Sequence, residues 1–143
     1  MEKFTSITGI AAPYLRANVD TDTIIRGGRS ALTAREDLGR YAFEAVRCKA
    51  DGSEDPDFVL NREPFRRPQI LIGGDNFGCG SSRESAVWAI AGMGVRCVIA
   101  PSFGGIFHGT CFQTGVLAVQ LARDTVMRLG QAILDDPARA TLS

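Results

Sequence analysis

Three short apolar runs separated by helical stretches constrain the fold of this chain more than any other feature. The runs are PQILIGG, VRCVIA and GVLAVQL, at residues 68–74, 95–100 and 115–121. Each run is rich in valine, isoleucine or leucine and is bounded by glycine or proline, as buried strands are. Residues 84–94 favour a helix that ends at Gly92 or Gly94, because glycine accepts a left-handed C-cap. This alternation predicts the α/β class, with parallel pairing in this half of the chain.

The remaining segments predict shorter elements. Residues 4–13 are rich in β-formers and end at a proline, which predicts an early strand, and residues 42–46 favour a short helix. The Gly27-Gly28 pair predicts a flexible segment, and residues 48–58 predict a loop.

After the second apolar run, Gly104 and Gly105 limit residues 102–112 to a loop or a weak short helix. Asp124 is the expected N-cap of a last helix that runs to about Leu134. The face of that helix toward the core would carry Val126, Leu129, Gly130 and Ile133.

Length and charge bound the class of protein. The 143 residues predict a single domain over residues 1–143, and the tail DDPARATLS predicts a further segment, as if the chain were trimmed at its C-terminus. Sixteen basic residues balance sixteen acidic ones, so neither nucleic acid nor a membrane surface is an expected partner. No apolar run approaches the ~20 residues of a membrane span. The N-terminus has no hydrophobic signal core, which predicts a cytoplasmic protein.

The cysteines do not form a metal-binding pattern. Cys48, Cys79, Cys97 and Cys111 are widely spaced, contain no C-x-x-C pair, and are accompanied by one histidine, His108. In a reducing compartment such cysteines are most simply buried or idle thiols. We therefore expect this chain to bind no metal or cluster by itself.

The stretch DNFGCGSSRES, residues 75–85, is the strongest candidate for a functional site. Gly78 and Gly80 permit positive φ and a close backbone approach to a ligand. Ser81 and Glu84 fit a capping box, which predicts a helix N-terminus at this point. Free amides at such a terminus, with two serine hydroxyls and Arg83, favour a bound carboxylate or phosphate. The stretch also follows a strand, where open α/β folds place their ligands.

Other readings of this stretch fit less well. The chain has neither the G-x-x-x-x-G-K-[ST] of a P-loop nor the G-x-S-x-G of a nucleophile elbow. A serine triad would need His108, and no spacing supports it. Cys79 lies near the predicted helix start, yet no base accompanies it. A plain capped turn with no ligand stays open at this point.

Several segments together resemble the small subunit family of 3-isopropylmalate dehydratase, the swivelling domain of the aconitase superfamily. They are GDNFGCGSSRE, VRCVIAPSFGGIF, TGVLAVQL, FTSITGIAAPYLRANVDTDTII and PDFVLNREPF, in the family's order. The resemblance covers nearly the whole chain and implies a swivelling β/β/α domain. It further implies a hydro-lyase subunit that isomerises 2-isopropylmalate and 3-isopropylmalate by dehydration and rehydration in leucine biosynthesis.

The resemblance also implies roles for individual residues. Ser81 would take the substrate proton, Asp22 would orient groups in the site, and Ser82 and Arg83 would bind a carboxylate of a small dicarboxylic hydroxy acid. A [4Fe–4S] cluster would belong to the large-subunit partner and activate the leaving hydroxyl. Arg26, Arg29 or Arg35 would reach the distal carboxylate, each with an exposed surface arginine as the plainer alternative.

Two departures from the family pattern leave the substrate open. Ser85 stands where the family usually has histidine, and RGGRSALTARED replaces the usual segment after DTDTII. A related hydratase for another substituted malate, of the methylmalate, dimethylmalate or citraconate type, is therefore an alternative. A non-catalytic anion-binding module is a second alternative from a different class.

Overall fold

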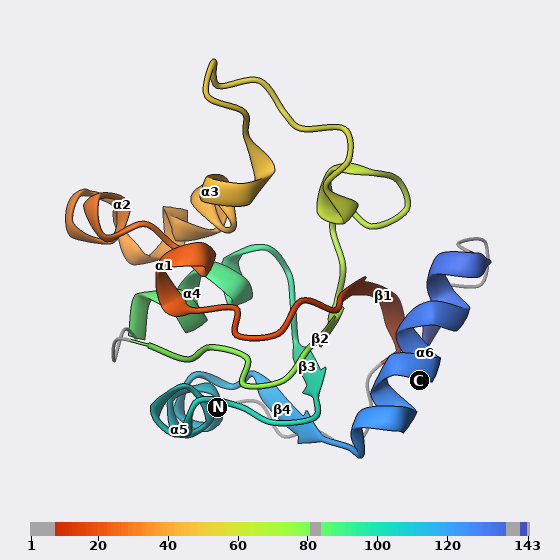
Figure 1. The fold of residues 1–143 in the computed structure, drawn as a ribbon. Coiled ribbons are helices and arrows are strands. Elements are labelled where there is room, and N and C mark those ends of the chain that lie inside the picture. Colours follow the sequence, from red (N-terminus) through yellow and green to blue (C-terminus); the bar gives the residue numbers. More distant parts are fainter. Residues whose placement is uncertain (1–7, 81–83, 137–140, 143) are drawn as a thin grey trace.

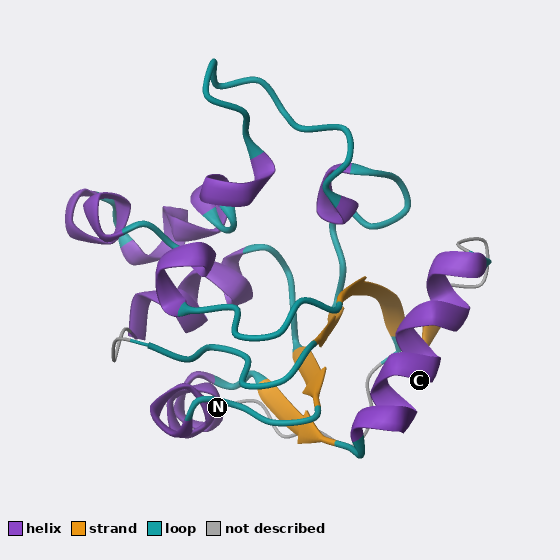
Figure 2. Ribbon diagram, viewed as in Figure 1, coloured by secondary structure: helices purple, strands orange, loops and turns teal. Residues whose placement is uncertain are grey.

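A mixed five-stranded sheet forms the centre of the fold, in the order β4-β3-β2-β1-β5 (Figures 1 and 2). The computed structural model describes residues 8–80, 84–136 and 141–142. The strands are β1 (Gly9–Tyr14), β2 (Ile70–Gly73), β3 (Cys97–Ala100), β4 (Leu117–Gln120) and β5 (Thr141–Leu142). β1 to β4 are parallel, and β5 is antiparallel to β1. The predicted α/β class with parallel pairing is confirmed.

Helices lie on both sides of this sheet. α4 (Glu84–Gly92) and α5 (Gly105–Thr114) lie on one side, and α6 (Arg123–Asp135) packs on the other against β1, β2 and β3 (Figure 1). The shared side of α4 and α5 follows from the strand order. β1 to β4 are parallel neighbours in sequence order, and right-handed crossovers between such strands place successive connections on the same face. Every residue of β2 is buried, as expected of a central strand covered on both faces.

The connection from β1 to β2 is long and contains only short elements. They are α1 (Thr21–Ile24), α2 (Gly27–Leu32), the 3-10 helix η1 (Arg35–Tyr41), α3 (Glu44–Arg47) and the 3-10 helix η2 (Val59–Asn61). α1 packs against α3 and α4, and η1 makes its main contact with α4. The start of the connection is thereby fixed beside the helix that follows β2.

Two expected boundaries are wrong for clear physical reasons. The segment predicted as a loop or a weak short helix over residues 102–112 instead enters a ten-residue helix, α5, at Gly105, and only residues 102–104 are loop. Gly104 and Gly105 stand at the beginning of α5 rather than inside it, and Phe107 and Cys111, four residues apart, are buried and hold it to the core. Asp124 is not the N-cap of α6. Ala122 occupies that position, and Asp124 lies in the first turn, where its charge still suits the positive helix end.

The other expected elements agree more closely. α4 ends at Gly92, and α6 buries Val126, Gly130 and Ile133 as predicted. The early strand, predicted over residues 4–13, forms as β1 from Gly9 and extends past Pro13, which pairs with Ile72, whereas residues 4–7 lie outside the described residues. A proline is tolerated there because β5 covers only the other end of β1 among the described residues.

Two smaller expectations concern the connection before β2. The predicted helix at residues 42–46 forms as α3, shifted toward the C-terminus. Gly27 and Gly28, expected to be flexible, begin α2. In the described residues no helix is long and apolar enough to cross a membrane.

The contact between η1 and α4 generates a testable prediction about two glycines. A Cβ atom on Gly39 would lie 2.3 Å from the carbonyl carbon of Gly92, so the backbones touch directly. Gly39→Ala is expected to lower the free energy of unfolding by roughly 1–3 kcal/mol, the usual cost of overpacking. Gly109→Ala is the control, because nothing lies within 4 Å of the added Cβ. That change in the middle of α5 should raise stability by up to ~1 kcal/mol. Urea unfolding of both variants tests the contact, and equal stabilities would contradict it.

Candidate functional site

The loop between β2 and α4 is hydrogen-bonded to the chain that follows β1. The Gly78 amide donates to the Val19 carbonyl (2.7 Å), and the Thr21 amide donates to the Cys79 carbonyl (2.9 Å). These bonds bring α1 to the edge of the loop. The predicted glycine-serine stretch therefore meets the DTDTII segment directly after their two strands end.

The opposite edge of the same loop is bonded to the chain that follows β3. The Phe77 amide donates to the Ser102 carbonyl (3.1 Å), and the Gly104 amide donates to the Phe77 carbonyl (2.9 Å). The Asn76 amide donates to the Ser102 hydroxyl (2.7 Å). The loop thus continues the sheet's pairing beyond the strand ends, with a neighbour on each side.

Glycines permit this close approach of three backbone segments. Gly78 and Gly80 have φ of +77° and +92°, as the sequence predicts. A Cβ on Gly78 would lie 2.2 Å from the Phe107 ring, and a Cβ on Gly104 would lie 2.7 Å from the Gly78 carbonyl oxygen. Larger residues at these positions would force the loop away from α5.

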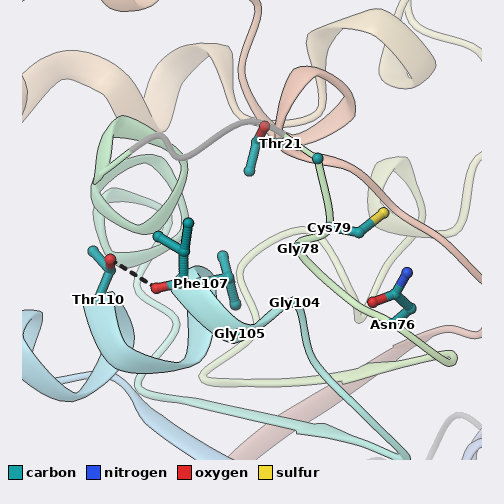
Figure 3. Close-up of a pocket in the computed structure, with 10 residues that line it drawn as sticks. Thr21, Asn76, Gly78, Cys79, Gly104, Gly105, Phe107 and Thr110 are labelled. Atoms are coloured by element: carbon teal, nitrogen blue, oxygen red, sulfur yellow. Dashed lines mark hydrogen bonds between the residues drawn. The ribbon is translucent and has the colours of Figure 1, made fainter.

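A pocket of about 230 Å³ opens where the three segments meet (Figure 3). Asn76 and Cys79 lie on one side of it, and Phe107 and Thr110 of α5 lie on the other. The residues that line it are Thr21, Asn76, Gly78, Cys79, Gly80, Gly104, Gly105, Ile106, Phe107 and Thr110. Its position at the carboxyl ends of parallel strands is the usual place for a ligand crevice in open α/β sheets.

The N-terminus of α5 forms one wall of this pocket. Gly104 is the N-cap and has no side chain to accept a bond from the first turn, and Gly105 and Ile106 follow it along the wall. A helix N-terminus carries a partial positive charge and unpaired amides, so it favours an anionic group. Phe77 packs edge-on against Phe107 at 5.6 Å between ring centroids and supports this wall from behind. The pocket therefore suits a carboxylate beside an apolar surface.

Asp20 fixes the other helix at the site. Its Oδ1 accepts from both the amide and the hydroxyl of Thr23, each at 2.7 Å, and so caps α1. The hydrogen bond from the Thr23 hydroxyl is the main reason that the pKa of Asp20 lies below its ordinary value. The ionised carboxylate therefore helps to hold Thr21 at the pocket wall.

The residues expected to carry the chemistry are only partly described. Ser81, Ser82 and Arg83, with the predicted capping box, lie outside the described residues, and Gly80 of the pocket directly precedes them. Asp22 lies on an exposed part of α1 beside Thr21. These residues keep their assigned roles as predictions.

The three candidate arginines differ in their surroundings. Arg29 pairs with both carboxylate oxygens of Glu44, at 3.1 and 3.0 Å, and stacks over Tyr41. Arg35 stacks over the Trp88 ring at 4.1 Å. Arg26 is exposed and has no side-chain bond or ion pair to another described residue. A substrate would have to compete with Glu44 for Arg29, whereas Arg26 is free to bind.

The described residues do not fit a cluster or metal site. No three histidine, cysteine, aspartate or glutamate side chains within residues 8–80 and 84–136 are grouped as metal ligands would be. Burial raises the pKa of Cys97 to about 11 and that of Cys111 to about 12. Both thiols are therefore protonated at neutral pH, whereas a cluster binds thiolates.

Sequence reasoning missed several residues of the pocket, above all those on α5. Gly104 and Gly105 were the sequence feature that could have predicted this wall of the pocket, because they follow β3 as Gly78 and Gly80 follow β2. Paired glycines after neighbouring parallel strands point to one shared edge. Asn76 also has a positive φ of 56° and bonds to Asn18, which nothing in its local sequence indicated.

Comparison with known proteins now decides the family. The model of the aconitase C-terminal domain matches residues 1–124. The chain belongs to the aconitase C-terminal domain family. Within this family it is similar to the 3-isopropylmalate dehydratase small subunit of Gluconacetobacter diazotrophicus, with 52% identity over 95% of this chain and 64% of that protein. The small subunit of Brucella canis is 48% identical over 97% of this chain and 67% of that protein.

A solved member of the aconitase C-terminal domain family has the same fold. The crystal structure of 3-isopropylmalate dehydratase (leuD) from Methanocaldococcus jannaschii superimposes with a TM-score of 0.65 at 32% identity. The match covers 82% of this chain and 64% of that one. The chain thus spans somewhat less than two thirds of the length of that protein and of the Gluconacetobacter relative.

The two loop glycines generate a prediction that distinguishes the cost of a positive φ from the cost of steric overlap with Phe107. A Cβ on Gly80 has no atom closer than 3.4 Å, whereas one on Gly78 would overlap the Phe107 ring. Gly80→Ala should lower the free energy of unfolding by about 1–2 kcal/mol, the cost of the left-handed conformation alone. Gly80→Asn should cost less, because asparagine tolerates that conformation. Gly78→Ala should cost more than either, and urea unfolding measures all three. An equal loss for Gly78→Ala and Gly80→Ala would contradict the packing of this loop on Phe107.

The cap of α1 generates a prediction about pH. Because the folded-state pKa of Asp20 is lowered, its stabilisation is present above the unfolded pKa and is lost as pH falls through the folded pKa. Asp20→Ala should lower the free energy of unfolding by about 1 kcal/mol at pH 7, the usual loss for an N-cap. The difference from the wild type should shrink below about pH 4. Thr23→Val, which removes one of the two bonds, should show a smaller loss. A difference that does not change between pH 7 and pH 3 would refute a charged cap.

Proposed function

We propose that this chain acts as the small subunit of a 3-isopropylmalate dehydratase. In this function, water is removed from 2-isopropylmalate and added back to give 3-isopropylmalate, a step of leucine biosynthesis. The similarity to small subunits named for this enzyme, at 48–52% identity over nearly the whole chain, supports the assignment. The observation that carries it is the pocket in which the glycine-serine loop meets the segments after β1 and β3.

The chemistry of the pocket walls agrees with a substituted malate as substrate. The N-terminus of α5 offers positive charge for a carboxylate. Ile106 and Phe107 supply an apolar wall, and Ile106 is 60% exposed. An isopropyl group would bury part of that exposed surface, which an unsubstituted malate would not do.

Proton transfer would be the task of Ser81, which continues the chain from Gly80 of the pocket. A serine hydroxyl is a very poor base in water and needs amides, a helix terminus and nearby cations to stabilise its alkoxide. Ser82 and Arg83 would hold a substrate carboxylate next to it. Asp22 would orient groups from α1, and Arg26 would bind the distal carboxylate, with Arg29 doing so only after release from Glu44.

The metal chemistry of the reaction would belong to another chain. Because the described residues offer no cluster ligands, we assign the [4Fe–4S] cluster to a large-subunit partner, which would supply the Lewis acid for the leaving hydroxyl. This chain would close one side of the shared site. We place the assembly in the cytoplasm, where reducing conditions keep free thiols such as its four cysteines unpaired.

Reconstitution with an iron–sulfur large subunit tests this function. The pair, but neither chain alone, should interconvert the two isopropylmalates. Ser81→Ala should lower turnover by about 10²–10⁴-fold, the usual loss of a general base, without weakening assembly of the pair. Ser85→Ala is the matched control and should keep most of the turnover. Assembly is measured by size-exclusion chromatography and turnover by the absorbance of the unsaturated intermediate.

The same reconstituted pair separates the rival functions. Isopropylmalate should be turned over faster than methylmalate, dimethylmalate or citraconate. A preference for one of those diacids would assign the chain to a related hydratase. A pair that assembles with an intact cluster and converts none of them would indicate a non-catalytic anion-binding module. Near-normal turnover of Ser81→Ala would disprove the role of that serine as the base.

A further inference from the structure

A second pocket, which we call the arginine pocket, lies at the C-terminal end of α4. Its volume is about 300 Å³, and it is lined by Gly39, Arg40, Arg47, Arg66, Arg67, Gly92 and Met93. None of these residues lines the pocket beside the glycine-serine loop. The loop leads into the other end of α4, and a helix of nine residues rises about 13 Å. The two pockets are therefore separate.

Positive charge dominates the arginine pocket. Arg66 is the one of its four arginines that forms ion pairs with other described residues, and the Glu54 carboxylate that it binds also attracts Arg47. The two terminal nitrogens of Arg66 donate to the two carboxylate oxygens of Glu54, each at 2.9 Å, and its Nε lies 4.0 Å from Glu63. Arg40 and Arg67 form no ion pair with another residue in the described part of the chain. Like charges gathered in one concave site repel one another unless an anion joins them.

Arg47 is the one arginine of this pocket whose side chain is partly removed from water. Its side chain is half-buried, and its Nη2 donates to the Leu60 carbonyl at 3.0 Å. Its Nε is buried without a hydrogen-bond partner. Burial is the first cause of the lowered pKa of Arg47, and the charge of Arg66 is the second. A partly desolvated cation beside another cation gains from any anion brought close to it.

The floor of the arginine pocket is rigid. Gly39 and Gly92 are in backbone contact, so the end of η1 and the end of α4 cannot approach more closely. The side-chain amide of Asn61 fixes the adjoining loop, because it donates to the carbonyls of Arg47 and Asp55 at 2.7 and 2.8 Å. The backbone beneath the pocket is thus fixed before a ligand binds, so that a ligand would have to order mainly the exposed side chains of Arg40 and Arg67.

We propose that the arginine pocket binds a small, multiply charged anion that bears phosphate or carboxylate groups. Arginine is the side chain best suited to such groups, because its planar fork donates two parallel hydrogen bonds. The volume lies at the lower end of the range of small-molecule sites, about 300–1,000 Å³. Met93 is the only apolar side chain in the lining, so the ligand is recognised by its charge. The balanced net charge of the chain and the single concave cluster disfavour nucleic acid, which needs an extended basic face.

Anion binding by the chain itself tests this proposal without any assay of turnover. Inorganic phosphate and malonate are titrated at constant ionic strength, with chloride as the compensating ion, and followed by calorimetry and by Tm. We expect saturable binding and a Tm that rises with anion concentration. Arg67→Gln and Arg40→Gln should each weaken binding about tenfold. Arg128→Gln is the matched control, because Arg128 is exposed on α6 and does not line this pocket.

The stability of the Arg67→Gln variant without anion shows whether Arg67 binds the anion or only supports the fold. Arg67→Gln relieves repulsion, so the anion-free variant should be at least as stable as the wild type while the response to phosphate is lost. A variant that loses stability yet keeps the full response would overturn the proposal. So would equal weakening by Arg128→Gln, or binding of a hexaglutamate peptide without binding of phosphate or malonate. The last result would instead identify a docking surface for an acidic protein segment.

Discussion

The site depends on the hydrogen bonding of one loop on both of its edges. The segment after β2 bonds to the segment after β1 through Gly78 and Thr21, and to the segment after β3 through Phe77 and Gly104. No side chain is needed for these bonds, so three loops become one rigid edge of the sheet. A pocket can exist there because the backbone segments that carry its lining residues are held at fixed spacing.

This constraint explains the glycines of the stretch and the position of α5. Gly78 has a positive φ and faces the Phe107 ring, so it combines the two requirements that exclude a side chain. Phe107 in turn anchors α5, whose N-terminus then faces the pocket. Packing of apolar groups behind the edge thus places the positive end of α5 at the pocket. The same fold in the leuD structure, at 32% identity, agrees with a constraint that acts mainly on backbone.

α4 connects two sites of different character. Its N-terminal end follows the glycine-serine loop, where positive charge would come from helix termini and Arg83. Its C-terminal end borders the arginine pocket, where the charge comes from side chains that lack enough acid partners. The arginines of the second pocket come from η1, α3 and the segment before β2, whereas α4 contributes Gly92 to the lining and also packs on α1 and α5.

The sequence by itself determined the α/β class, the three parallel strands after residue 68, and the loop that carries the positive-φ glycines. These are local properties, because β-branched runs, glycine conformations and helix endings are set by a few neighbouring residues. Only the tertiary structure decided that α5 is a full helix, because burial of Phe107 and Cys111 in the core stabilises it despite the glycines at its start. It alone also paired Arg29 with Glu44 and gathered arginines from η1, α3 and the segment before β2. Such meetings join residues far apart in the chain, and no local pattern encodes them.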